Sequence, residues 1–101
     1  MLDRELLKSV AAQMMSGNAV VLSEVRLPVK RTGARRFRTV QFEIDGRRYQ
    51  AIEQNRERPS RWGQLAREGH RVVQFRDLES NKYVAVAVDE EIMEYGKLGK
   101  K

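Results

Sequence analysis

The sequence contains no cysteine, a single histidine, two prolines and one tryptophan among its 101 residues. Without cysteine it can form no disulfide and no thiolate metal site, and one histidine cannot supply a pair of histidine ligands. No apolar run approaches the ~20 residues that a membrane-spanning helix needs. Both charge signs are mixed in residues 1–9, unlike an export signal. We expect a cytoplasmic protein that does not associate with membranes.

Motifs for catalysis and cofactor binding are also missing. The glycines are isolated, and none belongs to a GxGxxG or GxxxxGK phosphate-binding loop. His70 directly follows Gly69 at a predicted helix end, where packing of a turn is its ordinary role. The acidic run at 89–91 is typical of a solvated turn, with cation binding as the minor alternative. Glu53 and Glu57 could pair as acid and base, but nothing in the sequence brings them together. We expect no enzymatic activity, no cofactor and no metal.

Positive charge is concentrated in the middle of the chain. Residues 1–25 and residues 72–101 each carry a net charge of −1, whereas residues 26–71 hold thirteen basic and five acidic residues, a net charge of +8. Twelve of those thirteen basic residues are arginine, whose planar fork matches phosphate oxygens. A phosphate-bearing partner is the functional interpretation, and an arginine-rich codon preference is the alternative.

Apolar residues at helical spacing predict a first helix over residues 3–16. Asp3 is placed to cap its start, and Gly17 stands just past its end. The apolar stripe predicts a core face; the alternative is a docking surface for a second copy.

Two strands joined by Asp45-Gly46 are the clearest local signal. This dipeptide is the preferred two-residue hairpin turn, because both central positions need a positive φ. The turn sets a register with four pairs on one face, which are Ile44–Arg47, Phe42–Tyr49, Val40–Ala51 and Arg38–Glu53. Upstream, a β-branched run predicts one further strand over residues 18–27, stopped by Pro28.

A second, short helix is predicted over residues 59–68. Pro59 and Ser60 are start signals, and Gly69 ends the pattern. Trp62 lies on the apolar stripe of this helix, which favours a core anchor over a surface for stacking of bases.

The last third of the chain contains strands over residues 70–75 and 82–88, followed by a hairpin that turns at Asp89-Glu90. A two-residue turn at that position predicts the pairs Val86–Met93 and Val84–Tyr95. The fold class is therefore α+β, with residues 1–96 as one domain and residues 97–101 as a flexible tail. We expect a mainly antiparallel, strongly twisted sheet of five to six strands, with an N-terminal helix and one short central helix. A barrel-like sheet is the alternative if the twist is strong enough.

The stretch KRTGARRFR, residues 30–38, places five basic residues around a turn at Thr32-Gly33 between two strands. Basic hairpin tips bind phosphates in a salt-dependent way, so DNA or RNA is the expected partner and the backbone is the expected contact. The predicted contacts are Lys30, Arg31, Arg35, Arg36 and Arg38, with Arg58 and Arg61 as second contributors. The alternative is a solvated loop.

Few aromatic residues accompany these cations. Phe37 and Trp62 are the only plausible stacking residues near them, so the sequence shows no platform for single strands. The competing interpretation is a protein–protein interaction or regulatory module that uses the N-terminal helix or a sheet edge. We expect a monomer, because repulsion between +8 segments opposes self-association.

Overall fold

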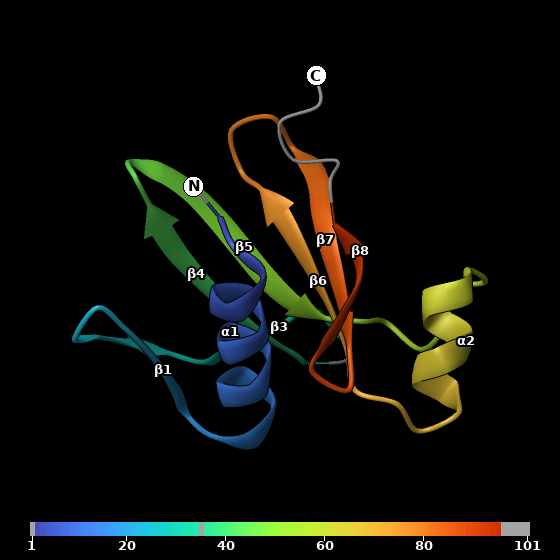
Figure 1. The fold of residues 1–101 in the computed structure, drawn as a ribbon. Coiled ribbons are helices and arrows are strands. Elements are labelled where there is room, and N and C mark those ends of the chain that lie inside the picture. The colour runs from blue at the N-terminus through green and yellow to red at the C-terminus, as the bar shows by residue number, and fades with distance from the viewer. Residues whose placement is uncertain (1, 35, 96–101) are drawn as a thin grey trace.

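The computed structural model describes residues 2–34 and 36–95, and in this part of the chain it has two helices and eight strands (Figure 1). In chain order the elements are α1 (Arg4–Ser16), β1 (Ala19–Leu22), β2 (Val25–Pro28), β3 (Lys30–Thr32), β4 (Phe37–Ile44), β5 (Arg47–Glu53), α2 (Arg61–Arg67), β6 (Val72–Asp77), β7 (Lys82–Val88) and β8 (Glu91–Tyr95). The α+β class is confirmed. The predicted tail, residues 97–101, lies outside the described residues.

The main sheet is an antiparallel meander with strand order β3-β4-β5-β6-β7-β8, and β1 and β2 form a separate two-stranded hairpin. Every strand of the large sheet therefore pairs with its neighbour in the chain. The strands twist strongly across the sheet in Figure 1, but the sheet remains open, with β3 and β8 as its edges, and does not close into a barrel.

Helix α1 packs across one face of this sheet, which we call the inner face. Its N-cap is Asp3, as predicted, because the Oδ1 atom of Asp3 accepts a 2.8 Å hydrogen bond from the backbone N–H of Leu6. The centre of the helix's apolar stripe is buried, with Leu6 and Met15 partly buried beside it, which confirms the predicted core face. The core residues of helix and inner face include Leu7, Val10, Met14, Val40, Phe42, Tyr49, Ala51, Val73 and Phe75.

The β4–β5 hairpin has the predicted register around Asp45-Gly46. Ile44 pairs with Arg47, and the ladder continues through Phe42–Tyr49 and Val40–Ala51. Both turn residues have positive φ, 54° at Asp45 and 79° at Gly46, as this turn type requires. Local turn chemistry therefore determines the centre of the sheet.

The prediction of one strand over residues 18–27 is wrong, because the chain reverses at Ser23-Glu24 and forms β1 and β2. Both turn residues are left-handed, with φ of 48° and 67°. This conformation is uncommon outside glycine, asparagine and aspartate, so the dipeptide carries no turn signal. Packing supplies the reason for the turn: Val20 of β1 is buried in the main core, and Leu22 and Leu27 pack against it from the two arms of the hairpin.

The predicted register of the last hairpin is wrong beyond its first two pairs. The turn at Asp89-Glu90 is correct, with Val88 paired to Glu91 and Ala87 to Ile92. A β-bulge then makes Met93 an extra residue, so Val86 pairs with Glu94 instead of Met93, and Ala85 takes the place of Val84 opposite Tyr95. Without the bulge, Glu94 would lie opposite Ala85 on the inner face, where burial of its carboxylate is costly.

Helix α2 packs on the opposite, outer face of the sheet. Ser60 caps it by accepting a hydrogen bond from the N–H of Gly63 at 3.2 Å, and the helix is slightly shorter than the predicted 59–68. Trp62 and Leu65 pack there against a small second cluster made by Ala66, Val72, Val86 and Val88. Trp62 therefore anchors α2, as predicted.

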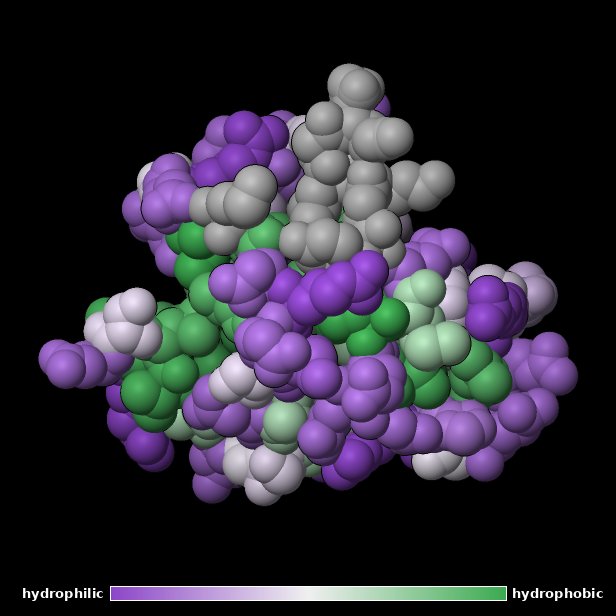
Figure 2. Space-filling model, in the orientation of Figure 1, coloured by the Kyte–Doolittle hydropathy of each residue, from purple (hydrophilic) through white to green (hydrophobic). Residues whose placement is uncertain are grey.

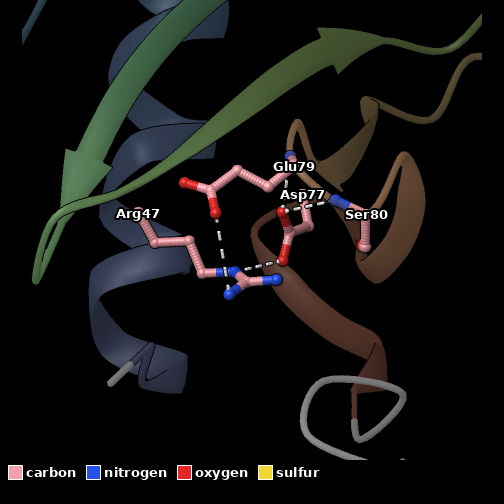
Figure 3. Close-up of polar contacts among 4 residues, drawn as sticks. All are labelled: Arg47, Asp77, Glu79 and Ser80. Atoms are coloured by element: carbon pink, nitrogen blue, oxygen red, sulfur yellow. Dashed lines mark hydrogen bonds and ion pairs between the residues drawn. The ribbon is translucent and has the colours of Figure 1, made fainter.

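The carboxylate of Asp77 is buried at one end of the sheet, where β6 ends (Figure 3). Asp77 is only 6% exposed; one oxygen accepts a 2.6 Å hydrogen bond from Nε of Arg47, and the other accepts the N–H groups of Glu79 and Ser80. Burial by itself would raise the pKa of Asp77, but these hydrogen bonds and the Arg47 charge outweigh it and leave the pKa below its ordinary value. Asp77 thus stabilises the fold in its ionised form.

Replacement of Asp77 by asparagine should lower the free energy of unfolding at pH 7 by about 1–3 kcal/mol, because hydrogen bonds to a charged group are lost. Since the folded-state pKa lies below the unfolded value, the contribution of Asp77 is complete above pH ~4 and is lost as the pH falls through the folded-state pKa. Urea denaturation at pH 7 and pH 3 should therefore show a smaller acid loss in D77N than in the wild type. Asp45→Asn is the control, because it removes the same charge at a turn whose conformation asparagine also adopts. An equal effect of both variants would contradict the stabilising role of the Asp77 carboxylate.

Candidate functional site

The predicted basic hairpin exists and forms one edge of the sheet. Strand β3 pairs with β4 through Lys30–Thr39, Arg31–Arg38 and Thr32–Phe37. Arg36 lies in the connecting turn with a φ of 59°, and its N–H donates to the carbonyl of Gly33. Arg35, which the sequence also predicts as a contact, lies outside the described residues.

One surface depression of about 350 Å³ gathers several of these cations; we call it the arginine depression. Its lining residues are Arg31, Arg36, Phe37, Arg38, Glu53, Arg56 and Glu57. Three of them belong to the predicted set. The fourth arginine, Arg56, comes from the loop after β5 and was not among the predicted contacts.

The four arginines do not have the same electrostatic surroundings. Arg38 is half-buried, and its Nη1 atom lies 3.3 Å from Oε1 of Glu53, which also accepts the backbone N–H of Arg38 at 3.1 Å. This pair continues the predicted Arg38–Glu53 register through side chains. Because Glu53 largely neutralises Arg38, the exposed cations Arg31, Arg36 and Arg56 are the better candidates for an anion.

The loop that carries Arg56 is held in place by α2. The Nη1 atom of Arg67, in the last turn of α2, donates to the backbone carbonyls of Arg56 and Arg58. Gly63 allows the loop to approach closely, since a Cβ atom at this position would overlap the carbonyl of Arg58. Arg67 is thus a positioning residue for the loop.

A second depression of about 380 Å³ lies on the other side of this loop, over the outer face of the sheet; we call it the aromatic depression. Its lining residues are Gln54, Arg58, Pro59, Ser60, Trp62, Gln74 and Tyr83. Tyr83 was not predicted as a site residue. It reaches the outer face because β7 pairs it with Arg76, across a bulge that no sequence signal marked.

Of the second contributors, only Arg58 lines this aromatic depression, while Arg61 contacts one of its lining residues, Trp62. The guanidinium carbon of Arg61 lies 4.6 Å from the centre of the Trp62 ring, in a cation–π contact. Of the described residues in the predicted set, three line the arginine depression and Arg58 lines the aromatic depression, whereas Lys30 and Arg61 line neither of the two.

The remaining candidates from the sequence have structural partners. Nδ1 of His70 lies 2.6 Å from Oδ2 of Asp89 in the turn of the last hairpin. The N–H of Arg71 is the main cause of a lowered pKa at Asp89, and His70 adds to it. Glu53 and Glu57 both line the arginine depression, where Glu53 is paired with Arg38. Within residues 2–34 and 36–95, no group of three His, Asp or Glu side chains could hold a metal ion.

Comparison of the chain with protein-family models, curated proteins and solved structures gave no significant match. No residue role can therefore be transferred from a relative. Among the described residues, no helix is long and apolar enough to cross a membrane.

Replacement of Gly63 by alanine should destabilise the protein by about 1–3 kcal/mol, because the new methyl group displaces the Arg58 carbonyl. Helix propensity alone would give the opposite sign, since alanine favours a helix over glycine by ~1 kcal/mol. Chemical denaturation decides between the two. Gly17→Ala is the matched control, because a Cβ there meets only an ordinary 3.6 Å contact at a φ of −151°. A stabilised G63A variant would show that the loop does not depend on this close approach.

Proposed function

We propose that the protein binds nucleic acid through backbone phosphates and has no catalytic role. The observation that carries this proposal is the arginine depression, where Arg31, Arg36 and Arg56 surround one hollow. Guanidinium groups around a common space match the geometry of a phosphodiester, which accepts two hydrogen bonds from one arginine fork. The confinement of a +8 net charge to residues 26–71 supports the same partner.

The carboxylates in this depression limit the strength of binding. Glu53 is committed to Arg38, and Glu57 adds a second negative charge to the lining. A site with such a balance suits weak, sequence-independent contacts with the backbone, in the micromolar range or weaker at physiological salt. A cytoplasmic monomer, as expected from composition and charge, belongs to the same proposal.

A protein partner is the second candidate function. The apolar stripe of α1 is buried in the core, so this helix does not offer it for docking. Figure 2 shows instead that hydrophobic residues gather over the β1–β2 hairpin, where Val21 and Val25 are exposed. An apolar contact at this hairpin would persist at high salt, whereas phosphate binding would not.

The double variant Arg31→Ala/Arg36→Ala should weaken binding to mixed-sequence DNA and RNA about equally for all sequences. The plot of log affinity against log salt should flatten by about 1.4 units for single strands and about 1.8 for duplexes, since two phosphate contacts are lost. Fluorescence anisotropy between 20 and 200 mM salt, about the range over which such contacts weaken, measures both quantities.

The matched control is Arg4→Ala/Arg48→Ala, which also removes two exposed positive charges. Both control residues lie away from the arginine depression. On α1, the residue beside Arg38 and Arg56 is Met15, which lines a neighbouring depression with them. Arg4 is eleven residues from Met15, about 16 Å along the helix. Arg48 lies about 17 Å along β5 from Glu53. An equal loss in the control would reduce the effect to net charge, and no binding of any nucleic acid at low salt would refute the proposal.

A further inference from the structure

The aromatic depression has a different chemistry from its neighbour. Its lining combines two aromatic side chains, Trp62 and Tyr83, with two amides, Gln54 and Gln74, and one arginine, Arg58. Flat apolar rings beside hydrogen-bonding amides are suited to a planar, polar-edged ligand. From this combination we infer that the depression binds an unpaired nucleobase, and hence that the ligand is single-stranded nucleic acid. This inference rests on the proposed function and specifies the class of its ligand.

Tyr83 is the principal stacking surface. The residue is 48% exposed, although it lies within a strand on the outer face of the sheet. Trp62 is half-buried against the second apolar cluster, and Arg61 lies over its ring. Trp62 therefore forms a wall of the depression, whereas the Tyr83 ring is open to a ligand. Stacking of a base on such a ring contributes without regard to base identity.

A buried amide supplies an unsatisfied polar group in the same lining. Gln54 is only 4% exposed, and its Nε2 atom donates to the carbonyl of Asn55 at 3.1 Å. Its Oε1 atom has no hydrogen-bond partner within the described residues. A buried acceptor without a partner is costly, but this oxygen is itself closed to solvent, so a ligand can bond it only after the Gln54 side chain turns toward the depression. The half-buried amide of Gln74 is the more accessible hydrogen-bonding group of this lining. Base edges carry matching donors and acceptors.

The loop between the two depressions joins base binding to phosphate binding. Arg58 lines the aromatic depression, and Arg56, two residues earlier, lines the arginine depression. A single strand whose base enters beside Tyr83 therefore passes its phosphates across this loop toward Arg31 and Arg36. A duplex cannot do the same, because its bases are paired and stacked inside the helix.

A proline-rich peptide is the other class of ligand that aromatic grooves accept. The charge of the surroundings favours nucleic acid, since Arg58 and Arg61 border the depression and Arg56 lies just beyond it. These cations attract a polyanion and give no advantage to a neutral polyproline helix. The peptide is therefore an outcome to be tested.

Fluorescence of Trp62 reports directly on the depression, because it is the only tryptophan of the chain. Three probes are compared at low salt: a mixed-sequence single strand as DNA and as RNA, an abasic strand of equal length, and a duplex. We expect the single strand to change Trp62 emission and to bind about 5- to 100-fold more tightly than the abasic strand, which has the same phosphates. The duplex should bind through phosphates but leave the emission unchanged.

Variants at Tyr83 separate stacking from apolar area. Tyr83→Phe should retain the preference for the single strand over the abasic strand, and Tyr83→Leu should remove most of it while abasic binding stays the same. Met93→Ala is the matched control, since Met93 is also 48% exposed but lies on β8. Denaturation of each variant checks that the fold is intact.

Three other outcomes would contradict base binding in different ways. Equal affinity for single and abasic strands, unaffected by Tyr83→Leu, overturns the base-binding inference and leaves backbone binding in place. If a polyproline peptide changes Trp62 emission, if Tyr83→Leu abolishes that binding, and if the single strand has no effect, the aromatic depression is a peptide-binding groove. Failure of every nucleic acid to bind refutes both the inference and the proposed function.

Discussion

The packing of α1 on the inner face of the sheet is the constraint on which the other features depend. Leu7, Val10 and Met14 are fully buried there, together with Phe75 at the centre of the sheet. The edge-to-face contact of Phe75 with Phe42, with ring centres 6.4 Å apart, extends this core across the strands. One small core therefore uses up the apolar face of the meander. The candidate binding residues are left to the outer face, the β3 edge and the loop between β5 and α2.

Local chemistry made much of this arrangement predictable, and non-local packing limited the rest. Asp45-Gly46 specifies its own turn and with it the pairing of β4 with β5. Ser23-Glu24 takes the same left-handed conformation only because the hairpin packs on the core, so no rule about dipeptides could reveal it. The bulge at Met93 likewise depends on which face must exclude Glu94.

The same distinction applies to the candidate site. Arg31, Arg36 and Arg38 belong to one hairpin, so their proximity could be anticipated from the turn between them. Arg56 joins them through the approach of a loop to α2, and Tyr83 lines the same depression as Trp62 only through the order and pairing of the strands in the sheet. Both positions depend on contacts between segments far apart in the sequence. Neither residue type nor spacing carries that information.

The position of α1 has a consequence for the order in which the chain can fold during synthesis. Helix α1 is synthesised before the sheet, yet it contacts β7 and β8, the last two strands of that sheet. Until β8 emerges, the apolar stripe of α1 lacks part of its cover, although the intervening hairpins can already close by local pairing. The strands of the meander can thus pair one after another as they are made, whereas the core between helix and sheet is complete only when the last strand of the sheet has been added. On the ribosome, part of the apolar stripe of α1 therefore stays uncovered until β8 has been made, and exposed apolar surface of this kind promotes aggregation.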